Sequence, residues 1–417
     1  MAVLTVRGPA AWSSLPRELR SPLERALAGD VVSPAEAHRL IHATADELPA
    51  LMQAAATLRD RGKGRTVTYS RKVFIPLTNL CRDSCGYCTF VKGPRHRDAW
   101  TMEPEDVLAV AQAGAERGCK EALFSLGERP EERYASMRTV LSRLGQPSTN
   151  AYLAAMCERV FSETGLIPHA NCGVMTRDEL LALREVNGSM GLMLESVSDR
   201  LLERGQAHYN CVGKVPATRL ETMAMAGELD IPFTTGILIG IGETPEERVD
   251  SVFAIRELQA RYGHIQEVII QNFRVKPTIR MRRWPEPSVG DMLTTIAVAR
   301  LILGPDMNVQ APPNLFLDDD AASSDTVDVS AYLDAGINDW GGVSPVTIDH
   351  INPERAWPAI TTLRELTDGA GHTLRERLCV YPEYLAQERF VRAGLRDHMA
   401  AWTDESGLVK EAATVWS

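Results

Sequence analysis

Three cysteines within eight positions constrain this chain more than any other feature. They read Cys81-Arg-Asp-Ser-Cys85-Gly-Tyr-Cys88 and follow the apolar segment Val73-Phe-Ile-Pro-Leu77. Three thiolates on one short loop can hold three irons of a cubane 4Fe-4S cluster and leave the fourth iron open. The alternatives are a structural zinc site, with His96 as the nearest fourth ligand, and three unrelated thiols in the protein core. Structural zinc sites usually combine two Cys-x2-Cys pairs, however, and the sequence has no second pair.

The composition is that of a globular protein, and the net charge limits the classes of partner that we expect. Hydrophobic residues make up 44% and charged residues 24% of the 417 positions, which argues against disorder. The formal net charge of −10 argues against nucleic acid as a partner, because nucleic-acid binders usually present a basic face. The densest basic cluster, Arg280, Arg282 and Arg283 near Lys276, is interpreted as a solvated loop or an anion contact.

Neither a secretion signal nor a membrane span is apparent in the sequence. The N-terminus lacks the apolar core of a signal peptide, and no run of about 18 apolar residues exists. The sequence therefore predicts a cytoplasmic protein. In that compartment eight cysteines are not expected to form a disulfide framework.

Strand candidates alternate with helical stretches through the middle of the chain. They lie near Val73 and at residues 121–125, 167–171, 189–195, 233–239, 268–273, 307–310 and 336–340. Near-continuous apolar runs are typical of parallel strands covered by helices, and the alternation predicts a βα architecture. We therefore expect an α/β fold with a TIM-type (β/α)8 barrel over residues 70–353, or an incomplete barrel of six units. Helical extensions are expected at residues 1–69 and 354–417.

Several residues within and after the cysteine loop resemble the supports of the radical S-adenosylmethionine (SAM) superfamily. The expected SAM contacts are an aromatic ring beside adenine, a GGE-like element, a carboxylate, an arginine, and glycines that let the backbone approach adenine. The candidates are Tyr87, Gly127, Glu128, Glu195, Arg219, Gly236, Gly240 and Glu243. The GGE-like element has Leu126 in place of its first glycine. Glu195 could instead be a helix N-terminal charge, and Arg219 a solvated helix arginine.

The resemblance implies what the cysteines do. In this superfamily a 4Fe-4S cluster, here on Cys81, Cys85 and Cys88, binds SAM at its open iron. Electron transfer then cleaves SAM to methionine and a 5′-deoxyadenosyl radical.

Longer segments between residues 71 and 353 are similar to the CofG family of deazaflavin-forming enzymes. They are the loop from Phe74 to Phe90, Ala207-His-Tyr209, Gln271-Asn-Phe273, Gln310-Ala-Pro-Pro-Asn314 and the segment from Asp334 to His350. The N-terminal region looks more like the start of FbiC, a fused protein in which a CofH unit follows the CofG unit. With one cysteine triad, the chain is expected to be a standalone CofG or the first half of a fused enzyme.

The resemblance implies a lyase reaction on a small molecule. CofG converts the 5-amino-5-(4-hydroxybenzyl)-6-(D-ribitylimino)uracil adduct to 7,8-didemethyl-8-hydroxy-5-deazariboflavin (FO) and releases ammonia, with SAM as the oxidant. The implied partners are a CofH-type enzyme or fused domain, which makes the adduct, and an electron donor such as flavodoxin or ferredoxin.

Neutral amides and hydroxyls on the late loops suit hydrogen bonds to a uracil edge and a ribityl chain. The expected substrate contacts are Tyr209, Gln271, Asn272, Gln310, Asn314, Asn338, Ser344 and Thr347. His208 and His350 are candidates for proton transfer, and Asp339 is a third candidate catalytic group. Each of these residues could instead serve only the structure of its loop.

Other functions remain open at this point. Within the superfamily the alternatives are a CofH-type enzyme, a menaquinone-pathway enzyme, or a biotin-synthase-like sulfur inserter. Sulfur insertion needs a second cluster, and the scattered Cys157, Cys172 and Cys211 do not form an obvious set. A different class would be an electron-transfer or structural metal protein, although a ferredoxin-like carrier needs four cysteines per cluster and a small fold.

Overall fold

Eight parallel strands close into a barrel in the order β2-β3-β4-β5-β6-β7-β8-β1, and β1 pairs with β2 to complete it. The computed structural model describes residues 12, 15–315 and 329–411. The strands are β1 Thr66–Pro76, β2 Glu121–Ser125, β3 Ile167–Asn171, β4 Ser189–Gly191, β5 Phe233–Ile239, β6 Ile265–Asn272, β7 Asn308–Gln310 and β8 Asp339–Val343. The expected eight-stranded barrel is confirmed, and the six-unit alternative is not.

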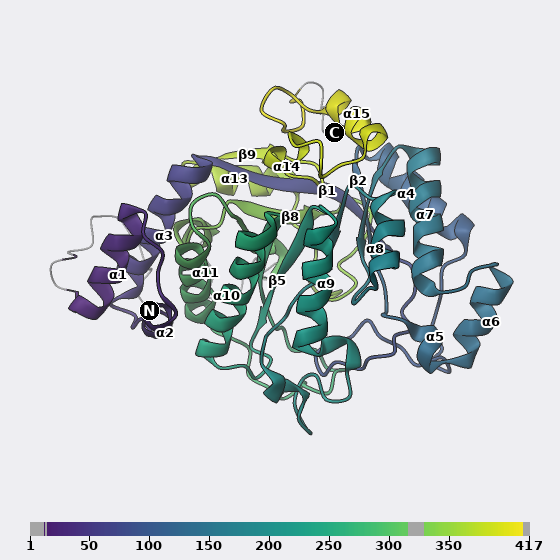
Figure 1. Cartoon of the computed structure of the whole chain (residues 1–417), viewed down its shortest axis with the longest axis horizontal. Coiled ribbons are helices and arrows are strands. Elements are labelled where there is room, and N and C mark those ends of the chain that lie inside the picture. The colour runs from purple at the N-terminus through teal and green to yellow at the C-terminus, as the bar shows by residue number, and fades with distance from the viewer. Residues whose placement is uncertain (1–11, 13–14, 316–328, 412–417) are drawn as a thin grey trace.

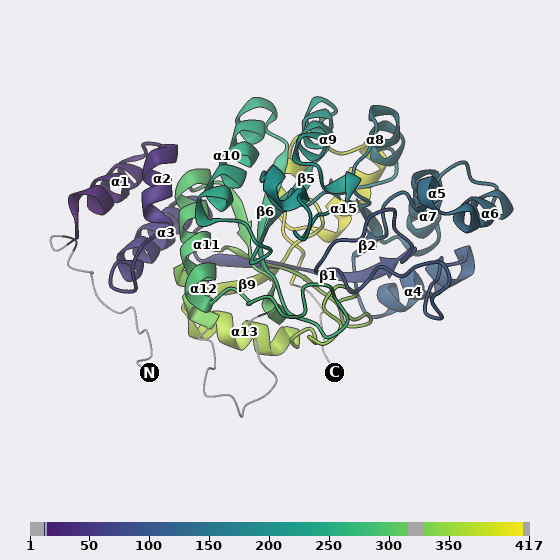
Figure 2. The ribbon, with the colours of Figure 1, turned by 90° about the horizontal axis from the view of Figure 1, so that it is seen from below.

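Helices lie outside the barrel and cover its strands (Figures 1 and 2). Side-chain caps fix several of their starts: Thr244 and Glu247 form a capping box on α10, and Ser288 and Asp291 form one on α11. The helices of the barrel region are α4 Pro104–Glu116, α5 Pro130–Arg133, α6 Ala135–Arg143, α7 Thr149–Thr164, α8 Arg177–Arg184, α9 Pro216–Glu228, α10 Pro245–Tyr262, α11 Val289–Leu303 and α12 Val329–Asp334.

Three helices before the barrel form a layer against its outside, at the end of the molecule farthest from α5 and α6 (Figure 2). They are α1 Arg17–Ala28, α2 Pro34–Leu40 and α3 Leu48–Lys63. α3 packs on α11 and α2 on α10. The helical part ends at Lys63, and β1 already begins at Thr66. The first strand therefore starts inside the segment that was expected to be helical up to residue 69.

The C-terminal segment, expected to be a mostly helical extension, carries a strand as well as helices. Its elements are α13 Ile360–Gly369, β9 Thr373–Glu376, α14 Pro382–Leu385 and α15 Ala393–Trp402. β9 pairs in parallel with Thr66–Tyr69, the first part of β1, whereas β2 pairs with the last part of β1. The segment therefore extends the sheet at the amino end of the barrel.

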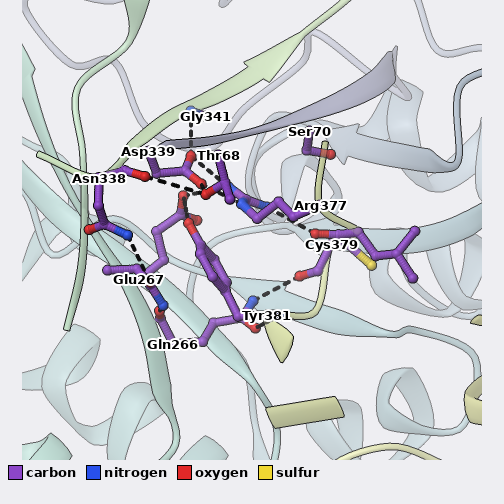
Figure 3. A network of polar contacts seen from close by, with 12 residues as sticks. Thr68, Ser70, Gln266, Glu267, Asn338, Asp339, Gly341, Arg377, Cys379 and Tyr381 are labelled. Carbon is purple, nitrogen blue, oxygen red and sulfur yellow. Dashed lines mark hydrogen bonds and ion pairs between the residues drawn. The ribbon is translucent and has the colours of Figure 1, made fainter. Parts of the chain in front are cut away.

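A buried network of polar side chains fills that amino end (Figure 3). Arg377, just after β9, donates to Asp339 Oδ2 at 2.6 Å and to Glu267 Oε1 at 2.8 Å. Tyr381 donates its hydroxyl to the same Glu267 oxygen at 2.9 Å. Asp339 also accepts from the hydroxyl of Thr68. The C-terminal segment thus closes the amino end of the barrel with a cation held between two carboxylates.

No helix in the described ranges has both the length and the apolar character that crossing a membrane requires.

Candidate active site

A cavity of about 250 Å³ opens at the carboxyl ends of the barrel strands. Enzymes with this fold place their catalytic groups at that end. Its walls come from the cysteine loop, from the ends of β2 to β6, and from the loop that follows β8. The lining residues that matter below are Cys81, Asp83, Cys85, Tyr87, Cys88, Glu128, Glu195, Lys214, Arg219, Gln271, Asn272, Lys276 and Asn352.

The three cysteines of the loop all line this cavity. Cys81 is buried, whereas Cys85 and Cys88 are partly exposed. Cys81 Sγ accepts backbone N–H bonds from Asp83 at 3.4 Å and Glu128 at 3.2 Å. As placed, no three His, Cys, Asp or Glu side chains within the described ranges converge closely enough to hold a metal ion. Three thiols on one loop, one of them already receiving two N–H donors, nevertheless fit an iron–sulfur cluster by their chemistry.

Gly127 holds the GGE-like element tightly against the cysteine loop. A Cβ atom on Gly127 would lie 1.8 Å from Leu80 O and 2.9 Å from Cys81 Cβ. Hydrogen bonds on both sides fix this approach: Gly127 N–H donates to Thr78 O at 2.8 Å, and Arg82 N–H donates to Glu128 O at 2.8 Å. The glycine is therefore required by the close approach of two backbone segments.

Contacts within the protein hold the Glu128 carboxylate in place. Its carboxylate lies between two glycines, since a Cβ on Gly173 or on Gly213 would come within 2.1 Å of it. Arg82 donates to Glu128 Oε1 through Nε at 3.1 Å. The Arg219 guanidinium lies 4.0 Å away. Glu128 thus lines the cavity as part of a buried charge cluster.

Glu195 points into the cavity from an unusual backbone position. Its φ is +67°, in the left-handed region, and its backbone makes only an isolated bridge to Ile237. β4 therefore stops at Gly191, short of the expected end at residue 195. Lys214 pairs with Glu195 Oε1 at 2.6 Å. Burial would raise the pKa of Glu195, but Lys214 and Arg219 outweigh that and hold the pKa below its usual value.

Arg219 is buried and anchors the backbone around the cavity. Its side chain donates to Met193 O at 2.7 Å and to Gly213 O at 2.6 Å. It lies on α9 but is 3% exposed, so the alternative of a solvated helix arginine is wrong.

Three further SAM-contact candidates, Gly236, Gly240 and Glu243, lie in β5 and the turn after it and do not border the cavity. A Cβ on Gly236 would meet Ile269 O of β6 at 2.2 Å. Gly240 has a φ of +89°, and the carboxylate of Glu243 accepts the N–H groups of Gly240 and Ile241, both at 2.8 Å. These residues hold the strand pairing and the turn.

Tyr87 lines the cavity, and His208 contacts the Tyr87 side chain. The Tyr87 hydroxyl lies 3.1 Å from His208 Nε2, and the two rings meet edge to face. Burial and the nearby Lys214 lower the pKa of His208 to about 3, so the imidazole is neutral at physiological pH. His208 itself does not border the cavity.

Of the candidate substrate residues, the structure brings Gln271 and Asn272 to the cavity, and the others lie elsewhere. Asn338 and Asp339 belong to the amino end, where Asn338 Oδ1 accepts from Arg300 at 2.8 Å. The remaining candidates that do not border the cavity are Tyr209, Gln310, Asn314, Ser344, Thr347 and His350.

Several of those residues form hydrogen bonds within the protein. Ser344 and Thr347 share a hydroxyl bond of 2.9 Å, and Thr347 Oγ1 accepts the Phe74 N–H at 2.9 Å. Thr347 and His350 border a second, separate pocket beside Phe74 and Trp100.

The cavity wall also contains residues that the sequence did not single out, among them Lys214, Lys276 and Asn352. Lys276 was noted only as a neighbour of a basic loop. A charged residue in a loop has no periodic signal, and its burial depends on the tertiary structure. The adjacent strand end at Gln271-Asn272 is the sequence feature that could have directed attention to Lys276.

Known proteins share sequence and architecture with this chain. Residues 75–255 match the model of the Radical SAM superfamily. A 7,8-didemethyl-8-hydroxy-5-deazariboflavin synthase from Methanopyrus kandleri is 48% identical over 344 residues, covering 82% of this chain and 100% of the relative. The chain belongs to the FO synthase family. An FO synthase from Nocardia farcinica is 48% identical over 410 residues, covering 95% of this chain and 46% of the relative.

This FO synthase-family chain therefore spans about half the length of the longer relatives it matches. Its fold also resembles that of the FeFe-hydrogenase maturase HydG from Carboxydothermus hydrogenoformans. That structure has a TM-score of 0.67 and 17% identity, and the match covers 92% of this chain and 88% of the other. At that identity the likeness concerns the fold alone.

Proposed function

We propose that this chain converts the p-hydroxybenzyl–ribitylaminouracil adduct to FO with release of ammonia. The observation that carries the proposal is one cavity that joins the three cysteines, the charged groups Glu195 and Arg219, and the amides Gln271 and Asn272. The match to a synthase over its whole length supports the same reaction. In this reaction one SAM is reduced to methionine and 5′-deoxyadenosine while the adduct is oxidised, a ring bond forms and ammonia leaves.

We infer that Cys81, Cys85 and Cys88 would hold a 4Fe-4S cluster and that SAM would bind beside it. Together the two cofactors would supply a hydrogen-abstracting radical. Tyr87 offers an aromatic face at the cysteine loop. Glu195, kept ionised by its cationic neighbours, can accept hydrogen bonds from the hydroxyl or ammonium groups of SAM.

The test is FO fluorescence after anaerobic reconstitution with SAM, reductant and adduct. Cys81→Ala, Cys85→Ala and Cys88→Ala are each expected to lose FO formation completely, because a cluster needs all three thiolates. Cys119→Ala is the matched control, since this free thiol is buried away from the cavity. If the wild type releases deoxyadenosine but forms no FO, the chain cleaves SAM and the assigned substrate is wrong.

Two partners belong to the proposal. We propose that a CofH-type enzyme or fused domain supplies the adduct, which agrees with relatives about twice as long as this chain. We also propose an acidic one-electron carrier, flavodoxin or ferredoxin, as the reductant. Exposed arginines border the cysteine loop although the chain is acidic overall: Arg282 and Arg283 follow Met281, whose N–H donates to Gly86 O at 3.1 Å.

The double variant Arg282→Glu/Arg283→Glu is expected to slow carrier-driven SAM cleavage by about tenfold at low salt, because charge complementarity accelerates encounter. Cleavage driven by dithionite, a small reductant, should not change. A matched reversal at Arg17 and Arg20, which lie on α1 far from the cavity, serves as the control. Equal slowing with both reductants would exclude a role in docking.

A further inference from the structure

The cavity contains a buried lysine that the proposed reaction has not yet used. Lys276 follows β6 by four residues, is 5% exposed and lines the cavity. Its ammonium donates to Asn352 Oδ1 at 2.7 Å and to Arg274 O at 3.2 Å. Within the described part of the chain, no carboxylate lies closer to it than Glu354, at 4.0 Å. A buried cation whose close partners are neutral oxygens favours a ligand atom that carries negative charge density.

An unpartnered acceptor lines the same cavity. Asn272, the last residue of β6, is 8% exposed and also lines the wall. Its Oδ1 is buried and has no hydrogen-bond partner among the described residues. Most buried polar atoms in proteins are hydrogen-bonded, so an acceptor left open beside a cavity points to a ligand that donates an N–H or O–H.

The loop after β8 holds the lysine in place. Asp349 accepts the backbone N–H of Asn352 at 3.1 Å and its side-chain N–H at 3.0 Å. It also accepts the side chain of Asn314 at 3.0 Å. These bonds orient the Asn352 amide so that its oxygen faces Lys276. Asn314 thus acts at a distance, as a residue that positions the loop.

We propose that Lys276 and Asn272 bind the pyrimidinedione edge of the substrate. Lys276 donates to a ring carbonyl oxygen, and Asn272 Oδ1 accepts the N–H next to it. This inference rests on the proposed function and names the part of the substrate that Lys276 and Asn272 contact. The imide edge carries an acceptor and a donor on adjacent atoms in one plane, which matches a cation and an open acceptor that line the same cavity. A phenol or ribityl hydroxyl carries both functions on one oxygen and does not need two separate protein groups.

The test measures binding of 5-amino-6-(D-ribitylamino)uracil to the reconstituted protein by calorimetry, alongside KM and kcat for FO formation. Lys276→Met is expected to weaken binding about 10- to 100-fold, the usual size of a charge-assisted hydrogen bond, and to raise KM more than it lowers kcat. Lys276→Arg should restore part of the binding. Lys410→Met, an exposed lysine in the C-terminal segment, is the control.

A methylated probe tests the second contact. Methylation of the imide nitrogen removes its proton, so it is expected to weaken binding to the wild type but to have little further effect in Asn272→Leu. Wild-type binding of the methylated probe at full strength would overturn the assignment of Asn272. If Lys276→Met still forms FO and its KM and probe binding are unchanged, the role assigned to Lys276 is wrong. Failure of the wild type to form FO would instead refute the proposed function.

Discussion

Replacing Arg377 by methionine is expected to lower the free energy of unfolding by about 3–5 kcal/mol, because it leaves two buried carboxylates without their cation. Glu267 and Asp339 are 4% and 0% exposed. The guanidinium of Arg377 contacts both carboxylates and stacks 4.1 Å from the centre of the Tyr381 ring. Methionine keeps much of the length and apolar volume of arginine, so the loss reports mainly the missing charge.

The size of this loss is expected to depend on pH. Burial raises the pKa of Glu267, and Arg377 opposes that rise. Without Arg377 the folded-state pKa of Glu267 moves further above its value in the unfolded chain. A carboxyl group with a raised pKa favours the folded state while protonated and loses that contribution as the pH rises through its folded pKa. The variant is therefore expected to be less destabilised at pH 5 than at pH 8.

Urea unfolding followed by circular dichroism at both pH values measures the effect. Arg392→Met is the matched control, since Arg392 pairs with Glu185 on the surface, where both side chains are about half exposed. That change is expected to stay within about 1 kcal/mol. Equal losses in the two variants, or a loss in Arg377→Met that does not vary with pH, would contradict the role given to the network.

The sequence predicted the bounds of some barrel strands correctly and shifted or lengthened others. The bounds of β2, β3 and β5 agree with expectation, and most positions of these three strands are buried. β8 was expected at 336–340 and lies at Asp339–Val343. Its Gly341-Gly342 pair has no apolar signal, and a Cβ on Gly342 would meet the Lys72 side chain at 2.4 Å. Tertiary packing, not local pattern, decides such a strand.

The sequence likewise identified some residues of the candidate site and misplaced others. Cys81, Glu195 and Asn272 were identified because each sits in a motif or at the end of an apolar strand, and all three line the cavity. Asp339 looked equally accessible by that reasoning, but it is the first residue of β8 and faces the amino end. Whether a polar residue stands at the first or the last position of a strand decides which end of the barrel it reaches, and an error of three residues in the strand reverses the answer.

Gly127→Ala is expected to abolish cluster incorporation and with it FO formation, although alanine adds only one methyl group. That methyl would lie 1.8 Å from Leu80 O, a backbone atom that cannot move independently. The backbone bonds of Thr78 with Gly127 and of Arg82 with Glu128 hold the two segments together on either side of the contact. The cysteine loop must therefore shift away from the GGE-like element, which moves Cys81 away from the N–H group of Glu128 that it accepts.

Iron content and visible absorbance after reconstitution measure this effect without relying on activity, and circular dichroism establishes that the variant is folded. Gly93→Ala is the matched control, because a Cβ there meets no atom within 4 Å, and it should bind iron like the wild type. A Gly127→Ala protein with full iron content would show that the cysteine loop tolerates displacement. Normal iron without FO would instead place Gly127 in SAM binding, as its resemblance to the superfamily element first suggested. Loss of iron in Gly127→Ala alone would assign the glycine to loop placement, since the two variants differ only in what surrounds the added methyl group.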